Sequence, residues 1–209
     1  MKQSFFNFIK KENYSSQDFI VSKSNSSAHN FLQNNFEKNI ILKGPPKCGK
    51  THLASIWKNK NSAIEYKSDK YEIIFQKKMH ILIDNFFLNL DEEKMFHLVN
   101  HCFNNNLKIL ISTEKSIANH EFKYADLKSR LMTFNLLEIK DPDDELIYNL
   151  LLKLLYDRQI IIKNEEIFDY IVKRINRTYD DIYKFVSKID RLSLEKKKKL
   201  TIPLIKELL

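Results

Sequence analysis

With 209 residues, 43% of them hydrophobic, the chain is long and apolar enough to bury a core, which excludes a disordered protein. It contains neither a run of about 18 apolar residues nor a long apolar segment behind Met1, so a membrane span and a secretory signal are not expected. Two distant cysteines, Cys48 and Cys102, favour free thiols in a reducing cytoplasm, and the formal charge of +8 suits work near nucleic acid.

Aromatic residues gather near the start of an otherwise polar stretch, where Phe5, Phe6 and Phe8 follow Gln3. Such a stretch is typical of a docking peptide or of a chain end that packs back on its own domain, and the residues alone leave both open. A short apolar run follows at residues 18–21. Residues 22–27 then supply turn and N-cap side chains for an expected helix.

The central motif is residues 44–51, which fit the phosphate-binding loop pattern G-x-x-x-x-G-K-[ST]. The apolar residues 39–42 predict a strand before it, and residues 52–57 predict a helix after it. Both glycines of the whole chain occupy the fixed glycine positions. Lys50 would reach the β- and γ-phosphates, and Thr51 would hold Mg²⁺. We therefore predict a nucleotide site that contains Gly44, Pro45, Pro46, Lys47, Cys48, Gly49, Lys50, Thr51 and His52.

A second apolar strand ends in an acid. Residues 80–84, His-Ile-Leu-Ile-Asp, look like a Walker B element, whose Asp84 would join the Mg²⁺ shell across from Thr51. The next residue is Asn85, where active ATPases of this type commonly carry a second acid that polarises the attacking water. The acids further along are expected on the solvated face of a helix: Asp91, Glu92 and Glu93.

Strands and helices alternate through the rest of the first 140 residues. Further strands are expected at residues 63–66, 107–113 and 134–139, and a further helix at residues 125–131. Ser112 and Thr113 end one of these strands, where a hydroxyl can sense a γ-phosphate or cap the following turn. The alternation predicts a mostly parallel, five-stranded sheet that helices cover on both faces.

From residue 141 onward the pattern is purely helical. Pro142 and the acids around it open a helix, and three more helical stretches follow, at residues 165–175, at residues 180–193 and near Pro203. We predict three parts: a flexible peptide at residues 1–12, an α/β nucleotide-binding domain at residues 13–140 and a helical lid domain at residues 141–209.

These motifs together resemble the AAA+ ATPases, and two stretches narrow the resemblance to DnaA-type initiators. Residues 18–25 resemble the stretch by which those initiators wrap the adenine, which adds four residues to the implied nucleotide site: Phe19, Ile20, Val21 and Asn25. Residues 127–131 look like their arginine-finger box. The resemblance implies that Arg130 acts in the site of a neighbouring subunit; a surface ion pair with Asp126 is the alternative.

The end of the chain points to the Hda family. Residues 188–193 and 199–209 are similar to the C-terminal end of Hda proteins, which are DnaA paralogues without the DNA-binding helix-turn-helix. This chain also ends after its lid, so we expect it to lack that domain. The clamp-binding peptide of Hda begins with Gln and continues with apolar residues, a pattern that four residues match: Gln3, Phe5, Phe6 and Phe8.

The resemblance implies a cytoplasmic regulator of chromosomal replication initiation that binds ADP or ATP with Mg²⁺. Together with the DNA polymerase sliding clamp, such a regulator promotes ATP hydrolysis on the DnaA initiator. Contact with DNA would be indirect or non-specific, no membrane is involved, and a homodimer is left open.

One position departs from the family. The sensor-2 arginine of the third lid helix aligns with Asp180, and Arg177 is the nearest candidate to replace it. An anion near the phosphates weakens γ-phosphate binding, so weak intrinsic hydrolysis is expected. Two other hypotheses are a self-sufficient ATPase, which Asn85 and Asp180 count against, and an adaptor that targets a replication protein to DNA. The missing helix-turn-helix counts against sequence-specific DNA binding by the latter.

Overall fold

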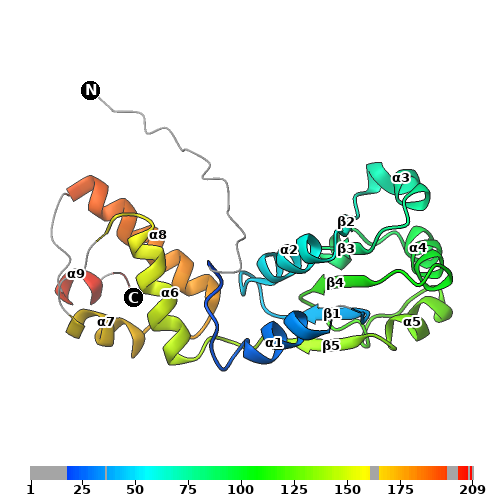
Figure 1. Ribbon diagram of the computed structural model, residues 1–209. Helices are drawn as coiled ribbons and strands as arrows, with labels where there is room; N and C mark the ends of the chain where they lie inside the picture. Colours follow the sequence, from blue (N-terminus) through cyan, green and yellow to red (C-terminus); the bar gives the residue numbers. More distant parts are fainter. Residues whose placement is uncertain (1–17, 36, 161–164, 197–201, 207, 209) are drawn as a thin grey trace.

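The computed structural model describes residues 18–35, 37–160, 165–196, 202–206 and 208. The predicted N-terminal peptide, with Gln3, Phe5, Phe6 and Phe8, lies outside the described residues. A layered α/β part and a helical lid lie next to each other (Figure 1), which confirms the predicted fold class. None of the described helices is long and apolar enough to cross a membrane.

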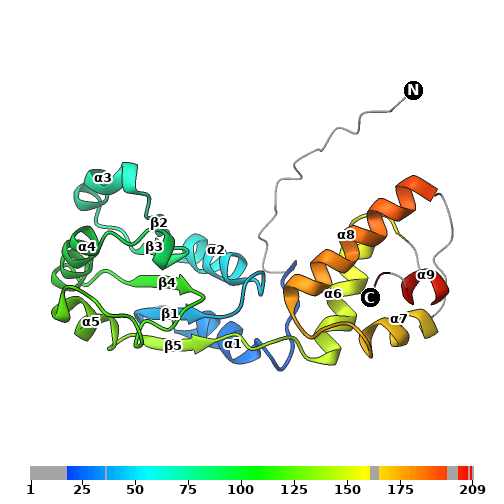
Figure 2. The ribbon, with the colours of Figure 1, turned by 180° about the vertical axis from the view of Figure 1, so that it is seen from behind.

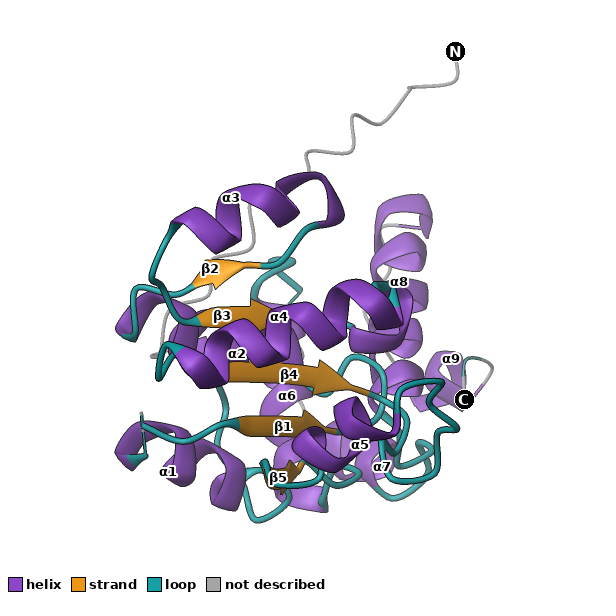
Figure 3. Cartoon of the chain, turned by 90° about the vertical axis from the view of Figure 1, so that its right-hand side faces the viewer, coloured by secondary structure: helices purple, strands orange, loops and turns teal. Residues whose placement is uncertain are grey.

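One sheet of five parallel strands forms the centre of the α/β part, in the order β2-β3-β4-β1-β5 (Figure 3). Because the strands are parallel, their carboxyl ends meet at one edge of the sheet, which is where ligands bind in such folds. In the central strands Ile40 lies opposite both Leu110 and Asn135. The strands are β1 (Ile40–Lys43), β2 (Ile64–Glu65), β3 (Ile81–Ile83), β4 (Ile109–Thr113) and β5 (Asn135–Glu138).

Helices cover both faces of the sheet. Side chains alternate between the two faces along each strand, so each strand contributes residues to both layers. Ile41 and Ile111 pack with the helices of one face, whereas Ile40 and Leu110 pack with those of the other. The first face carries α3 (Tyr71–Gln76), α4 (Glu92–Asn104) and α5 (Ala125–Leu131); the second carries α1 (Ser26–Asn34) and α2 (Lys50–Lys60). Two short 3-10 turns are η2 (Ser68–Lys70) and η3 (Phe86–Leu88).

The lid has a hydrophobic core of its own and an apolar contact with the α/β part. Asp143 caps its first helix, as its carboxylate accepts a hydrogen bond from the Leu146 N–H at 2.8 Å. Leu146 and Tyr179 pack in the same core as α1 and α2. The lid helices are α6 (Asp144–Tyr156), α7 (Glu165–Val172), α8 (Tyr179–Lys196) and α9 (Ile202–Lys206).

The structure differs from the sequence-based expectations in a few elements. Helix α2 begins at Lys50, two residues earlier than expected, and α3 was not expected at all. The expectation of a solvated face was wrong for Glu92, whose side chain is only 21% exposed and accepts the Lys123 N–H at 2.6 Å. Asp91 is the N-cap of α4, since it accepts the Lys94 N–H at 3.2 Å.

Several turns contain left-handed backbone. Among the described residues, Gly49 has a φ of +92°, and five residues other than glycine also have positive φ. They are Lys47, Ser62, Asn85, Asn106 and Gln159.

Candidate nucleotide site

The phosphate loop joins β1 to α2 through backbone that excludes side chains at both glycines. A Cβ on Gly44 would lie 2.7 Å from the Cys48 sulfur, and one on Gly49 would lie 2.9 Å from a ring carbon of Phe19. The Gly44 N–H donates to the Thr113 carbonyl at 3.1 Å, which fixes the start of the loop against β4. The loop therefore presents backbone at the N-terminus of α2, an arrangement that binds phosphate.

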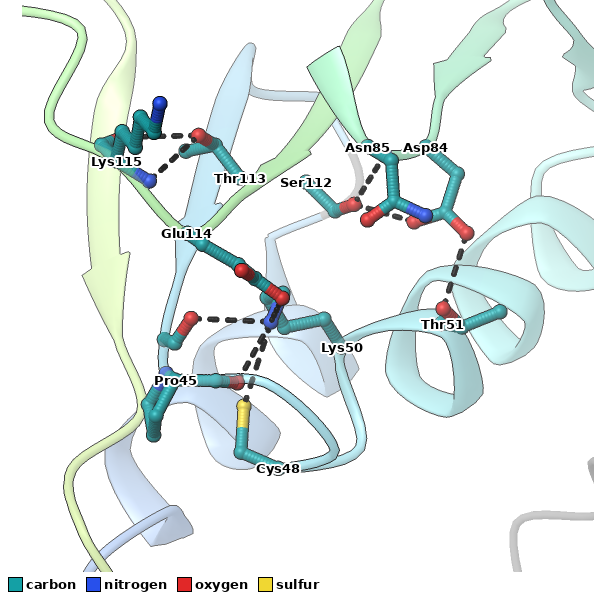
Figure 4. Close-up of polar contacts among 11 residues, drawn as sticks. Pro45, Cys48, Lys50, Thr51, Asp84, Asn85, Ser112, Thr113, Glu114 and Lys115 are labelled. Carbon is teal, nitrogen blue, oxygen red and sulfur yellow. Dashed lines mark hydrogen bonds and ion pairs between the residues drawn. The ribbon is translucent and has the colours of Figure 1, made fainter. Parts of the chain in front are cut away.

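Lys50 lies under this loop and is only 6% exposed. Its ammonium donates to the carbonyl oxygens of Gly44 at 3.0 Å and Pro45 at 2.7 Å, and it lies 3.6 Å from a carboxylate oxygen of Glu114 (Figure 4). Glu114 directly follows β4. The sequence analysis missed it, although an acid immediately after a strand at the ligand-binding edge was an available signal.

The predicted Mg²⁺ ligands lie in direct contact. The Thr51 hydroxyl donates to one Asp84 oxygen at 3.0 Å, and the Ser112 hydroxyl donates to the other (Figure 4). Ser112 also accepts the Asn85 N–H at 2.9 Å. The Thr113 hydroxyl instead accepts the Lys115 N–H at 3.2 Å, so of the two hydroxyls Thr113 caps the turn and Ser112 faces Asp84.

The chemistry of these oxygens fits Mg²⁺. A hydroxyl and a carboxylate are hard donors, which Mg²⁺ prefers, and Mg²⁺ is usually held by one or two protein ligands together with substrate phosphates. The described residues contain no cluster of three or more His, Cys, Asp or Glu side chains that would hold a metal ion. Thr51 and Asp84 are the residues that could hold an Mg²⁺ together with phosphate oxygens.

A cavity of about 120 Å³ opens between the loop and the lid. The Phe19 ring forms one wall, and it meets the His52 ring edge-on, with 5.4 Å between the ring centroids. The complete lining is Asp18, Phe19, Ile20, Asn25, Lys47, Cys48, Gly49, His52, Leu146, Leu150, Lys153, Leu154, Tyr179 and Tyr183. The residues from α6 and α8 were not predicted, because they lie about a hundred residues further along the chain.

The segment before α1 is held in place by hydrogen bonds. Asn25 is 2% exposed; its side chain donates to the Ile20 carbonyl at 2.9 Å and accepts the Ser22 N–H at 2.9 Å. From the lid, Lys153 donates to the Asp18 carbonyl. Val21, in contrast, is 42% exposed and does not line the cavity. The structure thus brings Phe19, Ile20 and Asn25 to the cavity but not Val21.

The lid contributes an anion on the other side of the loop. Asp180 accepts from Lys184 at 2.5 Å and from Lys47, at the tip of the loop, at 2.7 Å. These two ammonium groups, Lys184 first, lower the pKa of the Asp180 carboxyl. Arg177 lies 2.9 Å from Asp144, the first residue of α6, and is 64% exposed. Asp180, which the resemblance aligns with the sensor-2 arginine, therefore lies beside the loop tip, and Arg177 pairs with Asp144 instead.

Two other predicted residues have different surroundings. Cys48 is buried beneath the loop, and this burial raises the pKa of its thiol to about 11. Arg130 lies near the end of α5 and donates to Asp126 at 3.0 Å. Its guanidinium carbon lies 5.3 Å from the centre of the Phe103 ring. Helix α5 lies on the side of the α/β part away from the lid (Figure 1) and leads back to the amino edge of the sheet at β5. Its last turn, which contains Arg130, is therefore at the edge opposite to the phosphate loop.

The sheet order, the phosphate loop after β1 and the helical lid after β5 give the chain the fold of AAA+ proteins. Its fold is similar to domain III of DnaA from Thermotoga maritima, with a TM-score of 0.75, 17% identity, and coverage of 94% of this chain and 95% of that domain. It is also similar to AMPPCP-bound DnaA from Aquifex aeolicus, with a TM-score of 0.69, 20% identity, and coverage of 88% of this chain and 68% of that one.

Sequence comparison narrows this class. Residues 149–209 match the lid domain of Hda. DnaA, the chromosomal replication initiator protein of Buchnera aphidicola subsp. Cinara cedri, is 27% identical over 94% of this chain and 52% of its own length. The chain is thus similar to DnaA over most of its length and to the lid domain of Hda over residues 149–209. It spans about half the length of the curated relatives it matches.

Proposed function

We propose that this chain is a cytoplasmic regulator of DnaA that binds ADP or ATP with Mg²⁺ and, together with the sliding clamp, promotes ATP hydrolysis on the initiator. One observation carries the proposal. The residues that would hold a nucleotide, Lys50, Thr51 and Asp84, converge at the phosphate loop. By the resemblance, Asn85 and Asp180 stand where an active ATPase would carry an acid and a cation. Such a site favours holding a nucleotide over turning it over.

The chain's own residues have separable roles in this proposal. Residues 13–140 would bind the nucleotide, with the base beside Phe19. The lid, residues 141–209, would cover the nucleotide. Lys50 would exchange its loop carbonyl partners for phosphate oxygens, and Thr51 and Asp84 would hold Mg²⁺. When bound, Mg²⁺ supplies neutralising charge between the phosphates. The DnaA of Aquifex aeolicus, which binds AMPPCP, supports the choice of an adenine nucleotide.

Arg130 would act on the nucleotide of the partner. Its position at the far end of the sheet keeps it away from its own phosphate loop. To reach a partner it must leave Asp126, and an exposed pair of this helical spacing contributes only about 0.3–0.5 kcal/mol. An arginine finger accelerates hydrolysis roughly 10³–10⁵-fold, equivalent to about 4–7 kcal/mol, so the Asp126 pair is no barrier to this role.

The test mixes DnaA, sliding clamp on DNA and this protein, and measures phosphate release. The unmodified protein should stimulate release, and Arg130→Ala should abolish stimulation while it still binds ADP and the clamp. Deletion of residues 1–8 should abolish clamp binding but leave ADP binding intact. Asp126→Ala is the matched control, since it removes the surface pair and keeps the arginine. Full stimulation by Arg130→Ala would remove this residue from the mechanism, and no stimulation by the unmodified protein would refute the proposed function.

Glu114 favours a second candidate function, a self-sufficient ATPase. Its carboxylate lies 3.6 Å from the Lys50 ammonium, close to where a γ-phosphate would lie, and is 51% exposed. A carboxylate there could orient an attacking water, the role of the acid for which Asn85 stands at position 85. Turnover by the protein alone, near the typical enzyme rate of about 10 per second and lost in Glu114→Gln, would establish this function. Turnover far below that rate would contradict the ATPase function and favour the proposed regulator.

A further inference from the structure

The exposed face of α8 carries a row of cations. Lys184, Lys188 and Arg191 are spaced by four and three residues, so they lie on one face of the helix, about 6 Å and about 4.5 Å apart along its axis. All three residues are exposed. Lys47 of the phosphate loop lies at one end of the row, and Arg174, which follows α7, lies beside it. We call these five residues the cationic ridge.

Two hollows flank the ridge, and both are lined by Lys184 and Lys188. The larger has a volume of about 360 Å³ and is lined by Lys47, Tyr183, Lys184, Ser187, Lys188 and Arg191. The smaller has a volume of about 90 Å³, and Asp181 is the acid in its lining. Figure 2 shows α8 as a long, straight helix that runs from the junction with the α/β part to the outer end of the lid.

Positive charge exceeds negative charge on this surface. Asp180 accepts from Lys47 and Lys184, and Asp181 accepts from the Thr178 hydroxyl at 2.9 Å. Among the described residues that line the two hollows, five are cations and one, Asp181, is an acid. Lys188 also donates to the Leu208 carbonyl at 3.0 Å, and the Arg174 guanidinium lies 4.1 Å from the centre of the Tyr170 ring; neither contact removes a positive charge. Lys188, Arg191 and Arg174 do not line the cavity between loop and lid, so these three cations lie outside the nucleotide site.

We infer that the cationic ridge binds the phosphate backbone of duplex DNA without sequence preference. Evenly spaced cations on a straight helix suit a polyanion, since each phosphate contact releases condensed counterions. Single-stranded nucleic acid additionally needs exposed aromatic rings on which bases stack. The aromatic rings of the two hollows do not offer this: Phe185 is 3% exposed, and the half-buried Tyr183 ring has the Lys47 ammonium 5.7 Å from its centre. The buried Phe185 also offers no apolar anchor to an acidic peptide.

The test measures binding of a fluorescently labelled duplex of about 30 base pairs by anisotropy, over a series of KCl concentrations. The full chain should bind, with affinity that falls steeply as salt rises. The double substitution Lys188→Ala with Arg191→Ala should reduce the slope of log K against log[KCl] by about 1.8, since each lost phosphate contact removes about 0.9. The matched control is Lys77→Ala with Lys78→Ala, which removes two exposed lysines at the end of α3, far from the lid (Figure 1). This control should leave the slope unchanged.

Each other outcome overturns the inference. An unchanged slope in the ridge variant would place the DNA elsewhere, and a reduced slope in the α3 variant alone would place it near α3. Tighter binding of a single strand of the same sequence would show that single-stranded DNA, and not duplex DNA, is the preferred ligand. If the duplex does not bind even at low salt, the ridge is not a site for duplex DNA. Thermal unfolding of both variants checks that the lid remains folded, and the result does not depend on DnaA or on a bound nucleotide.

Discussion

The two sides of the phosphate loop differ in how their polar groups are held. On the sheet side, Thr51, Asp84 and Ser112 form a continuous chain of hydrogen bonds at the ends of three elements of the α/β part. On the lid side, Lys47 and Lys184 share Asp180 in a partly exposed cluster. The sheet side carries an acid and hydroxyls, whereas the lid side places a carboxylate beside the tip of the loop.

In the proposed function this difference separates two properties. Holding the phosphates would depend on the loop, Lys50 and the sheet side. Distinguishing ATP from ADP would depend on charge near the γ-phosphate, to which the lid contributes Asp180. If the comparison is right, mutations on the sheet side change affinity for both nucleotides, and mutations on the lid side change the preference between them.

Lys50→Ala should have the largest effect. Lys50 is buried, so its hydrogen bonds to phosphate oxygens would lie near the upper end of the range for charged groups, about 3 kcal/mol. ADP affinity should therefore fall by about 100-fold. Titration calorimetry with ADP measures the change. Lys58→Ala, which removes an ammonium from the same helix but from a pair with Glu65, should retain the parent affinity. Equal ADP binding by Lys50→Ala would end the phosphate-loop assignment.

Asp180→Arg should have an intermediate effect and should sharpen the comparison. It replaces the anion beside the loop by a cation. Since Asp180 is partly exposed, we expect only about a tenfold rise in ATP affinity relative to ADP. The control is Asp181→Arg, one residue further on. A ratio of affinities that stays the same would show that the lid side does not sense the γ-phosphate.

The smallest effect concerns pH. Lys184 and then Lys47 hold the pKa of Asp180 below its ordinary value of 3.8. A lowered folded-state pKa means that the contribution of Asp180 to stability is fully present above pH 3.8. It is lost only as the pH falls through the lower, folded-state value. An NMR titration of this carboxyl should therefore have its midpoint below 3.8. Lys184→Ala should raise the midpoint more than Lys47→Ala; the reverse order would contradict the geometry.

Local patterns in the sequence were sufficient for the fold and for the parts of the site that are contiguous. Three such features are the phosphate loop, the strand that Asp84 follows and the Asp143 cap. Each depends on residues a few positions apart, so the sequence alone predicts them. The short helix α3 was not predicted, because residues 71–76 are too few to show a helical period.

Contacts between distant residues could not be predicted in the same way. Glu92 reaches the backbone of Lys123, and Lys153 reaches that of Asp18, more than one hundred residues away. The pairing of Glu114 with Lys50 likewise depends on the neighbouring positions of β1 and β4 in the sheet. These partners follow from the order of the strands and the placement of the lid, which no short stretch of sequence contains.

The left-handed turns have a consequence for protein engineering. Glycine is absent from five turns whose backbone favours it, including those at Ser62 and Gln159, which lie outside the nucleotide site. A non-glycine residue in this conformation costs about 1–2 kcal/mol, whereas glycine adds about 0.5–1 kcal/mol of entropy to the unfolded chain. Ser62→Gly and Gln159→Gly are therefore routes to a more heat-resistant protein with an unaltered site.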